Sequence, residues 1–132
     1  MTVLGISAET VARLIAIARI GLGVAATLAP RLVARALMDD RDGSAAVAAR
    51  MLGGRDLALG LGAVLAARRG PAALRGWVEA GALADGVDAA AFAVSRRQRG
   101  LTRLATVVVA GGAAAAGMLA ARRLGGDSGQ RV

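Results

Sequence analysis

Eight ionisable residues lie inside stretches of the sequence that are otherwise apolar and long enough to span a membrane. They are Arg13, Arg19, Arg50, Arg55, Asp56, Glu79, Asp85 and Asp88. A charge at the centre of a bilayer costs about 2.5–3.5 kcal/mol on insertion scales, so such residues persist mainly where they pair or face a polar cavity. Because positive and negative side chains are balanced here, the residue types predict a charged interior. Two roles for it stay open: a static ion-pair network, or a site for protons or substrate.

The composition excludes most catalytic chemistry. The sequence contains no Cys, no His and no Tyr, so thiolate nucleophiles, the commonest metal ligand and the usual acid–base group at neutral pH are missing. We therefore expect no metal site, no cofactor and no enzymatic activity. The net charge of +8 would suit nucleic acid, but only 2% of the residues are aromatic. Since base stacking needs aromatic side chains, no nucleic-acid partner is expected.

Four apolar stretches, separated by charged connectors, must position the ionisable side chains. They run over residues 8–29, 44–67, 71–94 and 101–121. Each is close to the ~20 residues needed to cross the hydrocarbon core, and the mean hydropathy of +0.57 fits a membrane protein. Connectors of this length make sequential helices antiparallel. The sequence predicts an all-α fold, an antiparallel up-and-down four-helix transmembrane bundle in one domain (1–121), followed by a polar, disordered tail (122–132).

Local signals mark the expected helix ends. Ser7 suits an N-cap, Pro30 closes the first helix, and Pro71 is a favoured first-turn residue of the third. The connector 30–43 is longer than the other two and has apolar residues at helical spacing. It is either a short amphipathic helix on the membrane surface or a continuation of the first helix past a proline kink.

Two other readings of the chain compete with the membrane bundle. Residues 1–29 have some features of a secretory signal peptide, although the segment preceding its apolar part would be unusually long. The chain also resembles a soluble, alanine-rich bundle. Residues 104–121 disfavour that interpretation, because they carry no charge on any side and the rest of the chain offers little core to cover them.

The depth of each residue in an antiparallel bundle suggests which charges meet. With a rise of about 1.5 Å per residue, the middle of the membrane receives one group of four: Arg19, Arg55, Asp56 and Asp85. Arg50 then lies level with Asp88, so we expect these two to form a neighbouring pair. Glu79 points away from Asp88 around its helix and is expected to pair with Arg75, four residues earlier.

Glycines beside the charges have two interpretations. Gly53, Gly54 and Gly60 are expected to allow close helix contact, as small residues do in membrane bundles. The pair Gly53-Gly54 directly before Arg55-Asp56 also loosens the helix and can expose backbone groups to a ligand. A G-x-G-x-x-A pattern at 21–26 lies within an apolar helix and follows no strand, so a dinucleotide site is not expected.

One set of residues spread along the chain is, in order, Arg19 to Gly21, Pro30, Gly53-Gly54-Arg55-Asp56-Leu57, Gly60, Gly76-Trp77 and Asp85. In these residues the chain resembles a group of uncharacterised small bacterial integral membrane proteins with four helices and a G-x-R-D signature. These are distantly similar to the DoxX-like four-helix membrane proteins. The resemblance implies a four-helix membrane fold and no established reaction. DoxX-like proteins are associated with quinone-linked or redox functions, and the absence of Cys and His here weakens that association.

These observations lead to one expectation and one alternative for function. We expect a non-catalytic, multi-pass protein of the bacterial inner (plasma) membrane, either a small structural subunit or a binder of a lipid-like ligand. Its partners would be membrane lipids, with a protein partner or a second copy of the chain also open. The alternative is a small oligomeric transporter or channel that uses its intramembrane carboxylates. The arginines are spread almost equally over the two ends, so the positive-inside rule assigns no orientation.

Overall fold

The computed structural model describes residues 2–3, 6–38, 40, 42–94 and 100–126. Helices make up nearly all of this part: α1 (Ala8–Leu28), α2 (Pro30–Met38), α3 (Ala46–Ala67), α4 (Pro71–Val94) and α5 (Gly100–Gly126). Two short strands, β1 (Thr2–Val3) and β2 (Ile6–Ser7), pair antiparallel just before α1. The prediction of an all-α fold is confirmed for the described residues, apart from this small hairpin.

The helix ends expected at Ser7, Pro30 and Pro71 are confirmed by the backbone. The Ser7 hydroxyl accepts a hydrogen bond from the amide of Thr10 at 3.1 Å, which caps α1. At Ala29 the backbone leaves the helical region, with φ −126° and ψ 55°, and α2 begins at Pro30. Gly70 takes φ +110° immediately before Pro71 opens α4. Of the two interpretations of residues 30–43, the structure therefore shows a separate short helix.

A buried aspartate, Asp40, holds the start of α3. Its carboxylate accepts hydrogen bonds from the amide of Ala45 at 3.1 Å and the hydroxyl of Ser44 at 3.2 Å, and the residue is 1% exposed. A carboxylate on the first amides of a helix satisfies donors that have no partner within the helix. Since Ser44 is held in this turn, α3 begins at Ala46, slightly later than expected.

The last helix is longer than expected. Residues 122–126 belong to α5, so the prediction that the polar tail begins at residue 122 is wrong; residues 127–132 lie outside the described part of the chain. The physical reason is Leu124, which is buried in the same apolar cluster as Leu74 and Val78 of α4. Packing of this one leucine favours an extra helical turn despite Arg122 and Arg123 beside it.

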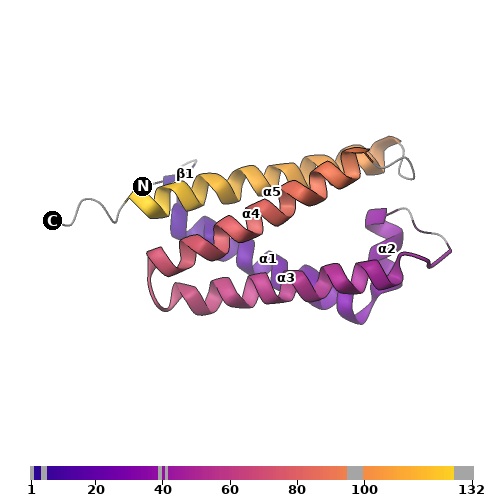
Figure 1. The fold of residues 1–132 in the computed structure, drawn as a ribbon, viewed down its shortest axis with the longest axis horizontal. Helices are drawn as coiled ribbons and strands as arrows, with labels where there is room; N and C mark the ends of the chain where they lie inside the picture. The colour runs from indigo at the N-terminus through magenta and orange to yellow at the C-terminus, as the bar shows by residue number, and fades with distance from the viewer. Residues whose placement is uncertain (1, 4–5, 39, 41, 95–99, 127–132) are drawn as a thin grey trace.

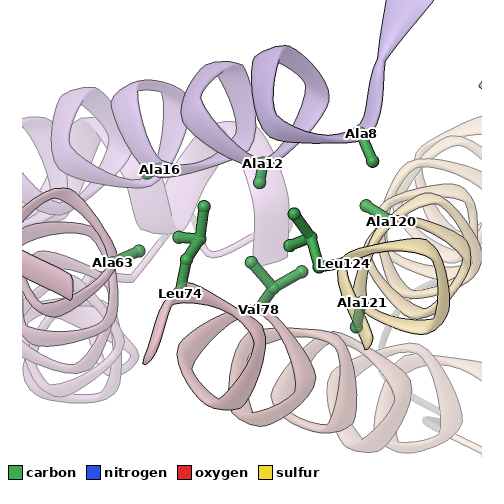
Figure 2. Packing of buried hydrophobic residues seen from close by; sticks show 9 residues of the cluster. All are labelled: Ala8, Ala12, Ala16, Ala63, Leu74, Val78, Ala120, Ala121 and Leu124. Atoms are coloured by element: carbon green, nitrogen blue, oxygen red, sulfur yellow. The ribbon is translucent and has the colours of Figure 1, made fainter. Parts of the chain in front are cut away.

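The four long helices run alternately up and down and form two pairs, α1 with α3 and α4 with α5 (Figure 1). The pairs meet at the end where α1 begins and α5 ends, and they diverge toward the other end, where α2 lies across the molecule (Figure 1). The apolar core joins the pairs at the closed end. Figure 2 shows its side chains pointing to one centre: Ala8, Ala12, Ala16, Ala63, Leu74, Val78, Ala120, Ala121 and Leu124.

Small residues fill the interior and large apolar residues face outward. Eleven of the fourteen buried hydrophobic residues in the described part of the chain are alanine. Large apolar side chains instead lie on the outer surface of every long helix, for example Ile17, Met51, Leu83 and Val108. In water this arrangement would leave much of the hydrophobic stabilisation unused, whereas in lipid the small residues let helices approach closely.

By length and composition, two segments of this structure are able to cross a membrane: Ala8–Leu28 and Arg103–Gly126. Less than a third of either segment is buried inside the structure. Helices α3 and α4 are long enough too, but α3 carries three ionisable residues and α4 carries four. Whether α3 and α4 suit a membrane therefore depends on where those charges point.

Glycines set the close approach of α1 and α3. A Cβ at Gly53 would lie 2.8 Å from the Ala26 Cβ and 2.9 Å from the Gly23 carbonyl oxygen, and one at Gly60 would lie 2.8 Å from the Ala16 carbonyl oxygen. A Cβ at Gly54 would meet no atom within 4 Å. Its expected role in close packing is wrong, because it is on the open side of α3, 100° around the helix from Gly53.

This difference gives the first prediction. Gly53→Ala forces a methyl group against the α1 backbone and should destabilise the bundle by about 1–3 kcal/mol. Gly54→Ala, one residue away, meets no obstacle and should be neutral or stabilising by up to about 1 kcal/mol, since alanine favours a helix over glycine. Thermal unfolding in mild detergent, followed by circular dichroism, compares the two. Equal effects of both substitutions would contradict the α1–α3 packing.

Candidate binding site

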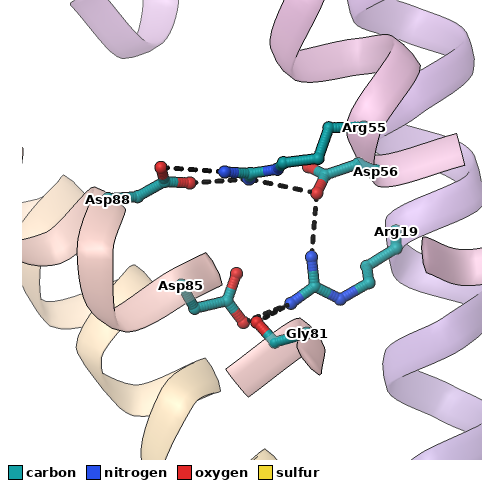
Figure 3. A network of polar contacts seen from close by, with 6 residues as sticks. All are labelled: Arg19, Arg55, Asp56, Gly81, Asp85 and Asp88. Atoms are coloured by element: carbon teal, nitrogen blue, oxygen red, sulfur yellow. Dashed lines mark hydrogen bonds and ion pairs between the residues drawn. The ribbon is translucent and has the colours of Figure 1, made fainter. Parts of the chain in front are cut away.

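Arg19, near the middle of α1, crosses the interior of the bundle to reach two other helices. One terminal nitrogen, Nη1, donates to Asp56 Oδ1 of α3 at 2.8 Å. The other, Nη2, donates to Asp85 Oδ2 of α4 at 2.6 Å and to the Gly81 carbonyl oxygen at 2.7 Å (Figure 3). A single guanidinium thus links the α1–α3 pair to α4 through charge-assisted hydrogen bonds.

Arg55 of α3 makes a second link to α4. Its Nη1 and Nη2 donate to the two carboxylate oxygens of Asp88, at 2.9 and 2.7 Å, which is the two-pronged geometry that arginine favours. Nη2 also lies 3.2 Å from Asp56 Oδ1. Asp56 therefore receives hydrogen bonds from both arginines and is the centre of a five-residue network, Arg19, Arg55, Asp56, Asp85 and Asp88 (Figure 3).

The network runs from the interior of the bundle toward its surface. The exposed fraction of the side chain rises from 4% for Asp56 and 9% for Arg19 to 14% for Asp85. It reaches 24% for Asp88 and 33% for Arg55. Because a lone charge is costly to bury, the two innermost members depend on their partners most strongly.

A glycine on α4 makes room for the buried guanidinium. A Cβ at Gly81 would lie 3.0 Å from Arg19 Nη2 and 3.1 Å from Arg19 Nε. The same residue supplies the carbonyl oxygen that Arg19 binds. Gly81 was not singled out from the sequence, because nothing near it in the chain signals that an arginine from another helix lies against it.

Between the diverging helix pairs lies a cavity of about 620 Å³. Its floor is charged, since Arg19, Asp56, Asp85 and Asp88 line it. Its walls are apolar and come from all five helices: Ile15, Ala18, Leu22, Ala36, Leu37, Leu52, Phe92, Leu101, Ala105, Val109, Ala110 and Ala113, with Thr106 as the other polar residue. An apolar cavity with a few convergent polar groups is the usual form of a small-molecule site.

The structure brings together most of the charges expected to meet. Arg19, Arg55, Asp56 and Asp85 belong to one network, although Arg55 bonds to Asp88 and Asp56, with no bond to Asp85. The expected pair Arg50–Asp88 is wrong. Arg50 is exposed, and its Nε lies 3.4 Å from the Thr27 carbonyl oxygen. The depth of the two residues was similar, but Arg50 lies 140° around α3 from Arg55 and faces another side.

The peripheral charges pair locally. Arg75 Nε donates to Glu79 Oε1 at 2.7 Å on the surface of α4, which confirms that expected pair. Arg13 pairs with Glu9 in the same way on α1, at 2.6 Å. Both pairs are well exposed and separate from the buried network. Among the described residues, no cluster of acidic side chains is arranged to hold a metal ion.

Neither a family model, nor a curated protein, nor a solved structure matches this chain. The resemblance of residues 53–57 to the G-x-R-D membrane proteins therefore stays a prediction.

The second prediction compares a carboxylate inside the network, Asp56, with one outside it, Glu79. Asp56→Asn leaves both guanidinium groups without their shared anion and should cost about 3–5 kcal/mol of folding free energy, as breaking a buried ion pair does. Glu79→Gln makes the same change of charge in an exposed pair and should cost less than about 1 kcal/mol. Thermal unfolding in detergent is again the measurement. An Asp56→Asn variant as stable as Glu79→Gln would show that the network does not hold the helices together.

Proposed function

We propose that the chain is a non-catalytic, multi-pass protein of the inner membrane that binds a lipid-like amphiphile between its two helix pairs. The observation that carries the proposal is the cavity of about 620 Å³ with apolar walls and a charged floor. Its volume falls within the range of about 300–1,000 Å³ that is typical of ligand sites. The apolar part of an amphiphile would lie along the walls, and its head group would reach the buried charges.

The outer surface supports a membrane location. All four long helices present large apolar side chains outward, while alanine and glycine fill the contacts between them. Scattered apolar residues are normal on soluble proteins, but an outward-facing apolar surface on every helix is not. Lipid tails would cover this apolar surface, and a protein partner or a second copy of the chain would cover part of it.

The charged helices fit the same interpretation. Four of the seven ionisable residues of α3 and α4 belong to the internal network, namely Arg55, Asp56, Asp85 and Asp88. Pairing removes most of the cost of placing them at membrane depth. Arg19 of α1 completes the network, and Ala12 and Ala16 of the same helix lie in the core. These contacts favour α1 as a permanent part of the bundle over its interpretation as a removable signal segment.

A second candidate function, transport of a proton or cation, rests on the same cavity. Asp56 and Asp85 line it, and carboxylates inside membrane bundles are a common feature of ion pathways. Asp85 would be the ion-responsive group in that case. Transport that survives replacement of both aspartates would remove this candidate.

The third prediction tests the membrane location. Because the natural chain has no cysteine, single introduced cysteines report their own surroundings. Val108→Cys and Ile17→Cys, on the outer faces of α5 and α1, should react poorly with a water-soluble maleimide in open membrane fragments and rapidly after denaturation. Arg69→Cys, in the connector between α3 and α4, should react in both states. Rapid labelling at positions 17 and 108 in native membranes would show that these faces meet water.

The fourth prediction tests the cavity. Ala110→Phe places a ring inside the cavity and should prevent lipid-sized molecules from remaining bound when the protein is extracted in mild detergent and weighed by native mass spectrometry. Ala115→Phe makes the same change on the exposed side of α5 and should leave the bound mass in place. If both variants keep the same bound mass, the ligand lies elsewhere. A stoichiometric partner chain without any small ligand would favour a structural subunit.

A further inference from the structure

The cavity has an excess of negative charge. Its floor contains one arginine, Arg19, and three aspartates, Asp56, Asp85 and Asp88. Including Arg55, which pairs with Asp88 from outside the cavity lining, the network holds two positive and three negative side chains. With every group ionised, one negative charge of this network has no positive counterpart among the described residues of the interior. A low-dielectric environment makes such an imbalance costly, so a positively charged ligand would be stabilised there.

The arginines have little capacity left for an anion. Both terminal nitrogens of Arg19 donate to Asp56, Asp85 or the Gly81 carbonyl oxygen. Both terminal nitrogens of Arg55 donate to Asp88, and one also contacts Asp56. Arg55 Nε is buried without a hydrogen-bond partner among the described residues, but Arg55 is not part of the cavity lining, so this donor is not offered to a ligand in the cavity. An anionic head group would have to displace a carboxylate from one of these bonds. The charge-assisted pairs that already exist therefore act against an anionic ligand.

The acidic side chains, by contrast, offer an acceptor. Asp85 binds Arg19 through Oδ2, and its other oxygen, Oδ1, accepts no hydrogen bond from the described residues (Figure 3). Phe92 lines the same cavity one helical turn beyond Asp88. The face of an aromatic ring attracts a cation electrostatically, and this attraction adds to that of the carboxylates.

We propose that the cavity selects a lipophilic organic cation with one positive charge, whose head group lies against Asp85 and Asp88 beside Phe92. Its apolar part lies along the walls that α1 and α5 supply, including Leu22 and Val109. This inference rests on the proposed amphiphile binding and adds the charge of the head group. The fixed ion pairs supply selectivity, because they hold the charged side chains in place and disfavour anions. The cation is attracted by the excess negative charge of the network as a whole, with Asp85 Oδ1 as the open oxygen.

Three probes share the same decyl tail and differ in the charge of the head group: decyltrimethylammonium, decyl sulfate and decanol. Comparing them separates the contribution of the head group to binding from that of the tail. Each is titrated calorimetrically into the full chain in nanodiscs of phosphatidylcholine, with Ala110→Phe as the blocked-cavity reference. We expect saturable, cavity-dependent binding of decyltrimethylammonium at least tenfold tighter than that of the other two probes. Asp85→Asn should reduce the preference to within threefold. Glu79→Gln removes the same charge from the same helix outside the cavity and should keep the full preference.

The outcomes separate this inference from the proposed function. If the three probes bind equally and Ala110→Phe blocks all of them, the cavity binds amphiphiles but does not select cations, and the inference is wrong. If no probe shows binding that Ala110→Phe removes, the proposed function fails as well. If Asp85→Asn does not fold, Asp88→Asn replaces it, since Asp88 is at the more exposed end of the network. A preference for the cation that survives in the folded aspartate variant would also overturn the inference.

Discussion

The architecture depends on the need to neutralise Arg19 inside the bundle. A buried guanidinium cannot stay unpaired, and this one is satisfied only where Asp56 of α3, Asp85 of α4 and the Gly81 carbonyl oxygen meet. That requirement determines the depth and rotation of three helices at once. Asp56 in turn accepts from Arg55, which binds Asp88. The network is thus a set of linked constraints, and each member limits how the α1–α3 pair lies against α4.

The two ends of the bundle differ because their side chains differ in size and polarity. At the closed end, alanines with Leu74, Val78 and Leu124 pack without charges and bring both helix pairs together (Figure 2). Beyond the network the pairs diverge, and apolar side chains line a space that they do not fill. A cavity of this size would be costly if it stayed empty, since its lining loses dispersion contacts. An occupant with an apolar body would restore those contacts.

The distribution of residue sizes explains why the helices depend on one another. Glycines and alanines supply close backbone contact, as between Gly23 and Gly53, and contribute little hydrophobic stabilisation of their own. Many large apolar residues face outward, where lipid would cover them in the proposed membrane location. In that setting α3 and α4 would suit the membrane poorly as single helices, because Asp85 and Asp88 of α4 find their arginine partners only on α1 and α3. Assembly and charge pairing are therefore the same event in this bundle.

The sequence by itself determined the all-α class, most helix ends and the type of residue in the interior, because these follow from local signals: the Ser7 cap, the breaks at Pro30 and Pro71, and charges within apolar stretches. It also indicated that Arg19, Asp56 and Asp85 would meet, since depth in an antiparallel bundle follows from chain length. Only the tertiary structure decided that Asp88 pairs with Arg55 instead of Arg50, that Gly53 but not Gly54 contacts α1, and that Leu124 extends α5. These three contacts depend on the rotation of each helix about its axis and on the angle between the two helix pairs. The same angle creates the cavity. No local sequence pattern encodes either quantity.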